Sequence, residues 1–288
     1  MSLVLVPGIG VRRNDALRWI RLFGVQFQPS EIMKICFIIF VAYLICKKGD
    51  KVKEFWNGIV AISSSFLLVL GLLYVQDHLS AMMIMAVILF VLLFVGRARI
   101  IHLIPVGIAG VVGATVYALS SEFRLRRLLI FRDPWQDSLG AGWQIIQSLY
   151  AIASGGVFGV GLSQGVQKYM YISEPQNDFI LATWAEEMGL IGVFFIIALF
   201  AIFVWRGIRI ATKAQDLYGA LLAVGITTMV GIQAVFNIAV VSSSMPVTGI
   251  SLPFCSYGGT SLLVLLMSMG LLLSVSRFTT SKEIKEEE

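Results

Sequence analysis

Seven long apolar segments constrain this chain more than any other feature of its sequence. A helix needs about 20 mainly apolar residues to cross a bilayer, and each segment comes close to that length. They cover roughly residues 30–46, 55–75, 79–96, 99–119, 188–205, 218–241 and 260–276. Only helices and closed barrels satisfy their backbone hydrogen bonds in lipid, and the sequence lacks the alternating strands of a barrel. We therefore expect an all-α, polytopic integral membrane bundle.

Composition supports one membrane domain over residues 1–288. The chain is 58% hydrophobic and 14% charged, whereas soluble proteins carry about 25% charged residues. Its net charge of +5 fits the excess of Lys and Arg that membrane proteins keep on their cytoplasmic side. We expect membrane lipids as partners and no nucleic acid. The three cysteines and two histidines show no metal-binding spacing.

The basic loops fall on one face of the predicted bundle. Loops rich in Lys and Arg are 47–54, 97–99, 206–216 and the C-terminal tail 277–288. The loops 76–78 and 242–258 on the other face contain neither residue type. Because short cytoplasmic loops carry the positive excess, we expect the tail in the cytoplasm. The large loop 120–187 is then extracellular.

Candidate chemistry gathers in that extracellular loop. Asp178 comes just before the predicted fifth span, with Glu174 nearby. A carboxylate at a helix N-terminus is favoured by the helix dipole, and sequence physics alone favours this capping role. The alternative is a general base at the membrane surface, which must lie within hydrogen-bond reach of the proton that it removes.

The same loop is basic. Its cationic side chains are Arg124, Arg126, Arg127, Arg132 and Lys168. They could contact anionic lipid headgroups, or they could hold the phosphates of a lipid-linked substrate. The sequence alone leaves both open.

Charged residues also occur within predicted spans. Glu31 and Lys34 are three residues apart, so they can meet on one helix face, and we favour an internal ion pair over a substrate contact. Ser30 is a suitable N-cap for that helix. Ionisable groups in a span usually face the bundle interior or water. For Glu186 and Glu187 we favour pairing with Arg or Lys over a functional role.

Three further features concern polar or irregular stretches. Trp143–Ala153 has helical apolar spacing and predicts an interfacial or partly re-entrant helix. We expect Asn237, inside the sixth span, to hydrogen-bond another helix. Pro246 and Pro253 break the chain outside the last span, as a re-entrant loop or a simple turn. By composition alone the chain could also be a transporter.

Several motifs together resemble the shape, elongation, division and sporulation (SEDS) family of FtsW, RodA and SpoVE. They are Phe27-Gln-Pro-Ser-Glu31 with Lys34, Asp133-Pro-Trp-Gln-Asp137, Glu174-Pro-Gln-Asn-Asp178, Pro246-Val-Thr-Gly-Ile250 and Ser256-Tyr-Gly-Gly-Thr260. The resemblance runs from Val6 to about Ser274 and is strongest to the FtsW/SpoVE branch. It implies a fold of ten helices, of which this chain would hold seven. Absence of the first three would explain arginines outside the membrane near the start.

The resemblance implies a peptidoglycan glycosyltransferase that polymerises lipid II at the outer face of the cell membrane, in division or sporulation. Asp178 matches the family's essential aspartate and would be the general base. Arg127 and Lys168 would contact the diphosphates of the substrate. The candidate substrate-binding set also contains Glu174, Glu31 and Lys34. The implied partner is a class B penicillin-binding transpeptidase. Room remains for a divalent cation, Mg²⁺ or Mn²⁺, because metals neutralise the charge of a leaving diphosphate.

One departure from the family pattern concerns Gln76-Asp-His-Leu-Ser80. The family's usual acidic position holds His78 here, and Asp77 stands one residue earlier. One residue rotates a helical position by about 100°, so we do not expect Asp77 to replace it. The rival hypotheses are a lipid II flippase, a non-catalytic scaffold that recruits a transpeptidase, and a truncated, inactive remnant.

Overall fold

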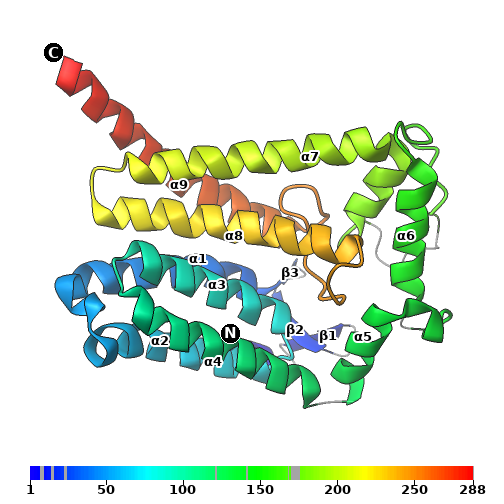
Figure 1. The fold of residues 1–288 in the computed structure, drawn as a ribbon, viewed down its shortest axis with the longest axis horizontal. Helices are drawn as coiled ribbons and strands as arrows, with labels where there is room; N and C mark the ends of the chain where they lie inside the picture. The colour runs from blue at the N-terminus through cyan, green and yellow to red at the C-terminus, as the bar shows by residue number, and fades with distance from the viewer. Residues whose placement is uncertain are drawn as a thin grey trace. The chain divides into compact units, whose positions relative to one another are not determined.

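The computed structural model is dominated by helices (Figure 1). It describes residues 1–6, 10–13, 16–22, 25–120, 122–140, 142–167, 169 and 176–287. The chain forms two compact units. The first comprises Met1–Gly110, Val204–Val230 and Gly259–Glu288, and the second comprises Val111–Phe203 and Gly231–Gly258.

Every one of the seven predicted spans is helical. The corresponding helices are α1 (Pro29–Lys48), α2 (Ala61–Val75), α3 (Leu79–Val95), α4 (Ile100–Leu119), α7 (Ile180–Thr212), α8 (Leu217–Val241) and α9 (Gly259–Glu287). The 3-10 turn η2 (Gly49–Lys53) follows α1, and the π-helical stretch η3 (Phe55–Val60) continues directly into α2, so that Phe55–Val75 forms one apolar span of 21 residues. Among the described helices, six segments are long and apolar enough to cross a membrane, and α3 is slightly shorter at 17 residues. The expected multi-pass helical membrane fold is confirmed.

The start of α1 differs from the sequence prediction. The helix begins at Pro29, and Gln28 occupies the N-cap position. Proline suits the first helical position because its ring presets φ and its missing N–H would be unpaired there anyway. Ser30 is therefore inside the helix, so the prediction that it is the N-cap was wrong. Its hydroxyl is buried and has no hydrogen-bond partner within the described part of the chain.

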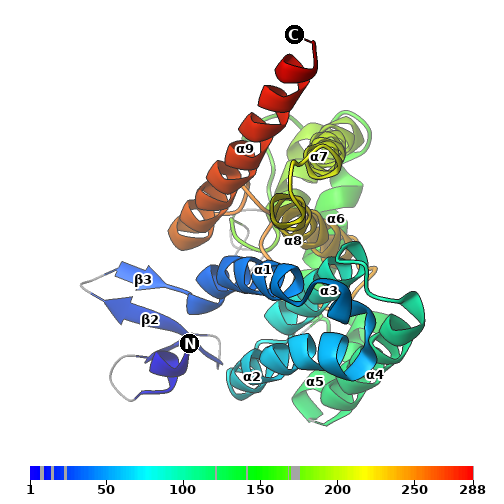
Figure 2. The same ribbon diagram turned by 90° about the vertical axis from the view of Figure 1, so that its left-hand side faces the viewer.

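The core of the first unit forms around α1. This helix packs against α3 and α9, and α3 packs against α2 (Figure 2). Ile38 of α1 is fully buried and lies against Gly225 of α8, where an added Cβ would come within 2.5 Å of Ile38 Cγ2. A larger residue at this glycine would force the two helices apart, so close packing here depends on the missing side chain.

A small antiparallel sheet precedes α1, which the all-α expectation did not include. After η1 (Ser2–Leu5), the strands β1 (Gly10–Arg13), β2 (Ala16–Leu22) and β3 (Val25–Phe27) pair in that order. Arg18 of β2 donates through Nε to the Gln76 carbonyl at 3.3 Å and through its guanidinium to the Asp77 carbonyl. The segment is too short and too basic to span lipid, and strand pairing satisfies its backbone instead.

The extracellular loop expected at 120–187 contains helices of its own. They are α5 (Glu122–Arg132), the single turn η4 (Pro134–Asp137) and α6 (Trp143–Gly155). The helix predicted at Trp143–Ala153 is confirmed, whereas its place at the membrane surface stays a prediction. The Ser148 hydroxyl of α6 is fully buried and donates to the Val241 carbonyl at 2.9 Å. This bond ties the loop helix to the end of α8.

The fifth predicted span starts earlier than expected and is interrupted. α7 begins at Ile180 rather than near 188, and Gly189 has non-helical dihedrals of φ 64° and ψ −165°. A positive φ of this kind is readily adopted by glycine and is strained for other residues. The first part of α7 therefore belongs with the loop, and the long apolar part follows Gly189.

Candidate active site

The backbone of Asp178 is held by a buried asparagine. Asn237 of α8 is fully buried, and its Nδ2 donates to the carbonyl of Asp178 at 2.8 Å and to that of Ile250 at 2.7 Å. The prediction that Asn237 bonds another helix was wrong, because both acceptors are loop carbonyls. One amide group carries two N–H donors, so Asn237 joins the segment before α7 to the loop before α9.

That loop, residues 242–258, packs closely on the segment around Asp178. Tyr257 N donates to the Gln176 carbonyl at 2.8 Å, and Ser256 Oγ donates to the Asn177 carbonyl at 2.6 Å. Gly249 has a φ of +66°, and a Cβ built there would lie 3.3 Å from Asp178 Oδ2. The Asp178 carboxylate thus faces a position without a side chain. The loop is more than a simple turn, because it forms one wall beside this carboxylate.

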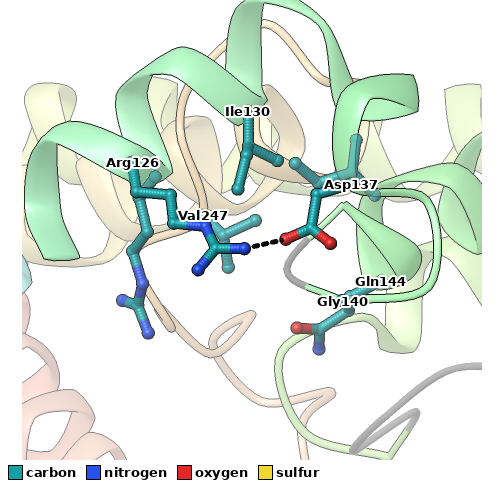
Figure 3. Close-up of a pocket in the computed structure, with 8 residues that line it drawn as sticks. Arg126, Ile130, Asp137, Gly140, Gln144 and Val247 are labelled. Atoms are coloured by element: carbon teal, nitrogen blue, oxygen red, sulfur yellow. Dashed lines mark hydrogen bonds and ion pairs between the residues drawn. The ribbon is translucent and has the colours of Figure 1, made fainter.

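A cavity of about 350 Å³ opens in the same unit (Figure 3). Its lining residues are Arg126, Arg127, Ile130, Asp137, Gly140, Gln144, Ile145 and Val247. Arg126 forms an ion pair with Asp137, with 2.8 Å between Nη2 and Oδ2. The Arg126 side chain is 67% exposed, and exposed pairs contribute about 0–1 kcal/mol. Its guanidinium can therefore exchange this carboxylate for another anion at little cost.

Arg127 adds a second guanidinium to this cavity. It keeps a solvent-exposed surface, while partial desolvation by its surroundings lowers the pKa of its guanidinium from the ordinary value. Arginine nevertheless stays protonated in proteins. Guanidinium groups bind phosphates and carboxylates through paired N–H donors. A cavity with two such groups is suited to an anionic ligand.

The two aspartates of Asp133-Pro-Trp-Gln-Asp137 have different tasks. Asp133 caps η4, accepting from Trp135 N at 3.2 Å and from Gln136 Nε2 at 3.1 Å. Asp137 points to the cavity, and a Cβ on Gly140 would lie 2.4 Å from Asp137 Oδ1. The absence of a side chain at Gly140 therefore leaves the space that the Asp137 carboxylate occupies.

The cavity and Asp178 share the loop 242–258 as a neighbour. Val247 lines the cavity and Gly249 faces the Asp178 carboxylate. Two residues of extended chain span at most roughly 7 Å, so both features border one short piece of backbone.

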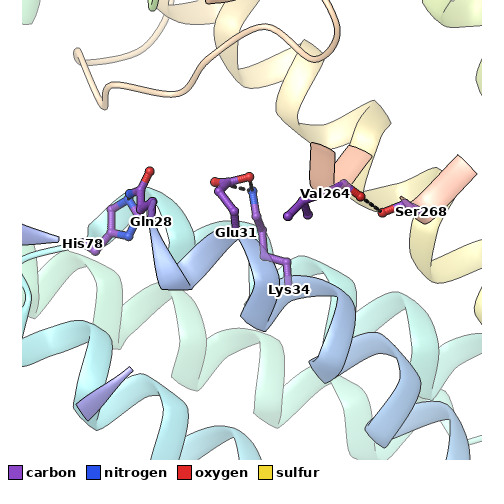
Figure 4. A network of polar contacts seen from close by, with 6 residues as sticks. All are labelled: Gln28, Glu31, Lys34, His78, Val264 and Ser268. Carbon is purple, nitrogen blue, oxygen red and sulfur yellow. Dashed lines mark hydrogen bonds and ion pairs between the residues drawn. The ribbon is translucent and has the colours of Figure 1, made fainter. Parts of the chain in front are cut away.

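Glu31 and Lys34 form the predicted ion pair in the first unit (Figure 4). Lys34 Nζ lies 2.8 Å from Glu31 Oε2 and 2.9 Å from Oε1, and the side chains are 3% and 15% exposed. The pair is thus confirmed. The pair is satisfied within α1 itself, and its role in binding substrate stays a prediction.

His78 occupies a buried position beside α1. It is the N-cap residue of α3, is 6% exposed, and its Nε2 lies 3.3 Å from Gln28 Nε2. Burial, followed by the charges of Arg18 and Lys34, lowers the pKa of His78 well below its ordinary value. Asp77 is exposed, whereas His78 beside it is buried; that Asp77 does not replace the family's acidic residue stays a prediction.

Glu186 has partners other than those predicted. Its carboxylate is 3% exposed and accepts from the backbone N–H of Val166 at 2.8 Å and of Gln167 at 3.2 Å. In the described residues the expected Arg or Lys partner is replaced by these two amides. The sequence signal that could have indicated this was the glycine-rich run before Gln167, which lets backbone come close to α7.

Two candidate residues, Lys168 and Glu174, lie outside the described residues. Asp178 and Arg127 both belong to the second unit, and Glu31 and Lys34 belong to the first. Within the described part of the chain, no group of three His, Cys, Asp or Glu side chains is arranged to hold a metal ion. We therefore assign no step of a mechanism to the divalent cation that the family resemblance allows.

Comparison with known proteins decides the family. The family model for FtsW, RodA and SpoVE, described as "Cell cycle protein", matches residues 1–281. The chain belongs to the FtsW/RodA/SpoVE family. "Stage V sporulation protein E" of Bacillus subtilis is 45% identical over 283 residues, covering 97% of this chain and 76% of that protein. "Probable peptidoglycan glycosyltransferase FtsW" of Trichlorobacter lovleyi is 44% identical, covering 96% of this chain and 72% of the relative.

Solved structures agree with this assignment. One reported as "Structural coordination of polymerization and crosslinking by a peptidoglycan synthase complex" matches with a TM-score of 0.78 and 32% identity, over 96% of this chain and 78% of that chain. The crystal structure of RodA, the rod shape determining protein of Thermus thermophilus, matches with a TM-score of 0.67 and 28% identity, over 96% and 74%. This chain is thus similar to members of the family in sequence and in fold.

Proposed function

We propose that this family member is a peptidoglycan glycosyltransferase that polymerises lipid II into glycan strands at the outer face of the cell membrane. One observation carries the proposal. In the loop 242–258, Val247 lines the cavity that contains Arg126 and Arg127, and Gly249, two residues later, lies beside the Asp178 carboxylate. A diphosphate-linked sugar needs cations for the diphosphate and a base for the attacking hydroxyl. Relatives named as peptidoglycan glycosyltransferases support this reading.

In the proposed reaction Asp178 is the general base. Its carboxylate accepts the proton of an acceptor sugar hydroxyl while that oxygen bonds to the anomeric carbon of the donor. The bond between the anomeric carbon and the diphosphate oxygen breaks, and undecaprenyl diphosphate leaves with the bonding electrons. Asn237 donates to the Asp178 carbonyl, and we propose that this bond helps to hold the base within the hydrogen-bond reach that proton transfer requires.

The cationic side chains stabilise the negative charge of the diphosphate. Arg127, with Lys168, is proposed to contact the diphosphate groups, because charge-assisted hydrogen bonds to phosphate are strong and directional. Charge that grows on the leaving oxygens is stabilised best by donors already in place. Glu174, Glu31 and Lys34 complete the proposed substrate-binding set.

The proposal includes an orientation and a partner. The segment 120–187 lies outside the cell and the tail 277–288 lies in the cytoplasm, as the distribution of Lys and Arg predicts. The proposed partner is a class B penicillin-binding transpeptidase, which would cross-link the strands as they form. The similarity to a chain from a peptidoglycan synthase complex favours such a partner.

The test is lipid II polymerisation by the purified chain together with its transpeptidase, comparing native protein with Asp178→Asn. Asp50→Asn is the matched control, because Asp50 is an exposed aspartate in a predicted cytoplasmic loop. We expect glycan strands from the native chain and the control and none from Asp178→Asn. Equal activity in all three would remove Asp178 from the mechanism. No strands from any, with membrane insertion verified, would favour a flippase, a scaffold or an inactive remnant.

A further inference from the structure

The break in α7 is filled by backbone from the glycine-rich loop that follows α6, residues 156–165 (Figure 1). Leu190 N donates to the Gly156 carbonyl at 2.9 Å, and Val160 N donates to the Glu186 carbonyl at 3.0 Å. A broken helix leaves amides and carbonyls without partners inside the helix. The glycine-rich loop supplies these partners, so the groups in these bonds need no water.

The apolar side chains of the glycine-rich loop are exposed. Phe158 is 83% exposed and Leu162 is 65% exposed, and Val157 and Val160 are exposed as well. No Asp, Glu, Lys or Arg occurs in residues 138–167. Large exposed apolar patches are rare on soluble proteins and mark sites that bind a membrane or another protein. The loop therefore presents a surface that is suited to an apolar environment.

The exposed apolar surface of α7 begins at the same place. Leu190 and Ile191, directly after the break, are exposed, and Phe194 and Phe195 follow them on the helix. Residues 188–205 carry no charge and provide nearly all of the about 20 apolar residues that a span requires. Leu190 and Ile191 therefore lie near one boundary of the hydrocarbon layer. Because their amides donate to carbonyls of the glycine-rich loop, the loop lies at the same depth.

Backbone hydrogen bonds fit the loop for this depth. Gly159 N donates to the Gly155 carbonyl at 2.7 Å, and Gly161 N donates to the Glu187 carbonyl at 3.1 Å. A Cβ on Gly159 would lie 2.1 Å from the Glu187 carbonyl oxygen, so glycine permits this close contact with α7. Irregular backbone is tolerated at membrane depth only where protein satisfies its polar groups. At these bonds the loop meets that condition.

We propose that the glycine-rich loop is embedded in the lipid bilayer, with its four exposed apolar side chains from Val157 to Leu162 among the acyl chains of one leaflet. This surface continues the lipid-facing surface of α7, which favours lipid over a protein partner. Ser163 and Gln164, the exposed polar residues that follow, lie at headgroup level. In the orientation proposed above the leaflet is the outer one. The inference depends on the membrane fold and does not depend on glycosyl transfer.

The test uses single cysteines that carry a fluorescent label, in the full chain reconstituted in lipid nanodiscs. The native cysteines, Cys36, Cys46 and Cys255, are first replaced by alanine. Phe158→Cys and Leu162→Cys then report on the loop at two independent positions. Because both side chains are exposed, these substitutions remove little packing, and thermal unfolding of each labelled chain verifies the fold.

Two further positions serve as controls. Phe194→Cys is the lipid control, because Phe194 is exposed within the uncharged part of α7. Asp50→Cys is the water control, because the Asp50 side chain is 93% exposed in a Lys-rich loop. Each label is measured with brominated acyl chains, which quench in the hydrocarbon layer, and with iodide, which quenches in water.

We expect brominated lipid to quench the labels at 158 and 162 as strongly as the label at 194. Iodide should quench only the label at 50. Quenching of both loop labels by iodide, with no effect of brominated lipid, would overturn the inference. If an added transpeptidase then protected the loop labels from iodide, the loop would be a protein interface instead. Because no reading requires turnover, a chain that makes no glycan strands would contradict the proposed function and leave this inference intact.

Discussion

Asn237→Leu is the substitution that best tests how Asp178 is held. Leucine has a similar volume but lacks both donors, so the carbonyls of Asp178 and Ile250 lose partners now at 2.8 Å and 2.7 Å. A buried polar group without its partner costs about 1–3 kcal/mol, which gives about 2–6 kcal/mol for the two. Free of this bond, Asp178 can move, and a misplacement of about 1 Å costs on the order of 10²-fold in rate.

The matched control is Gln233→Leu. Gln233 stands one turn earlier on α8, is 6% exposed, and makes no hydrogen bond within the described part of the chain. Thermal unfolding in detergent and lipid II polymerisation would be measured for both variants. We expect Asn237→Leu to unfold several degrees below the native chain and to polymerise about 100-fold more slowly, while Gln233→Leu stays near native in both. Identical behaviour of the two variants would refute the reasoning.

Three other perturbations have defined outcomes. Gly189→Ala should strongly destabilise the folded chain, because φ is +64° and the new Cβ would lie 2.4 Å from Gly159 N. The control Gly113→Ala in α4, which has open space around it, should be tolerated. Equal yields of folded protein from the two variants would contradict this prediction. Glu31→Gln should lower the free energy of unfolding by about 3–5 kcal/mol, because it leaves the Lys34 charge buried and unpaired. Adding Lys34→Met should restore thermal stability but not polymerisation. Recovery of both would remove the pair from the substrate-binding set. The pKa of His78 is lowered from 6.5 in the folded chain, so below about pH 6.5 the unfolded chain binds a proton that the folded chain does not bind, and stability should fall by up to about 1.4 kcal/mol per pH unit. His78→Gln should flatten this slope in unfolding measured between pH 7 and 5. An unchanged slope would show that another group causes the acid sensitivity.

The sequence by itself determined the class of fold and most of the candidate residues. Hydropathy is a local property, so seven apolar segments predicted seven helices before any packing was known. The Glu31–Lys34 pair was predictable for the same reason, because a spacing of three residues places both side chains on one face of a helix.

Tertiary structure decided the partners of the polar groups. Asn237 lies 59 positions from Asp178 in the sequence, and no local pattern shows that its amide selects that carbonyl. Glu186 was expected to pair with Arg or Lys, whereas within the described part of the chain its carboxylate accepts from two backbone amides of a glycine-rich loop. The small sheet before α1 was missed because its strands are short and become stable only by pairing. Hydropathy and residue spacing describe only neighbouring residues along one helix. The partner of a buried polar side chain depends instead on which distant part of the backbone the fold brings within about 3 Å.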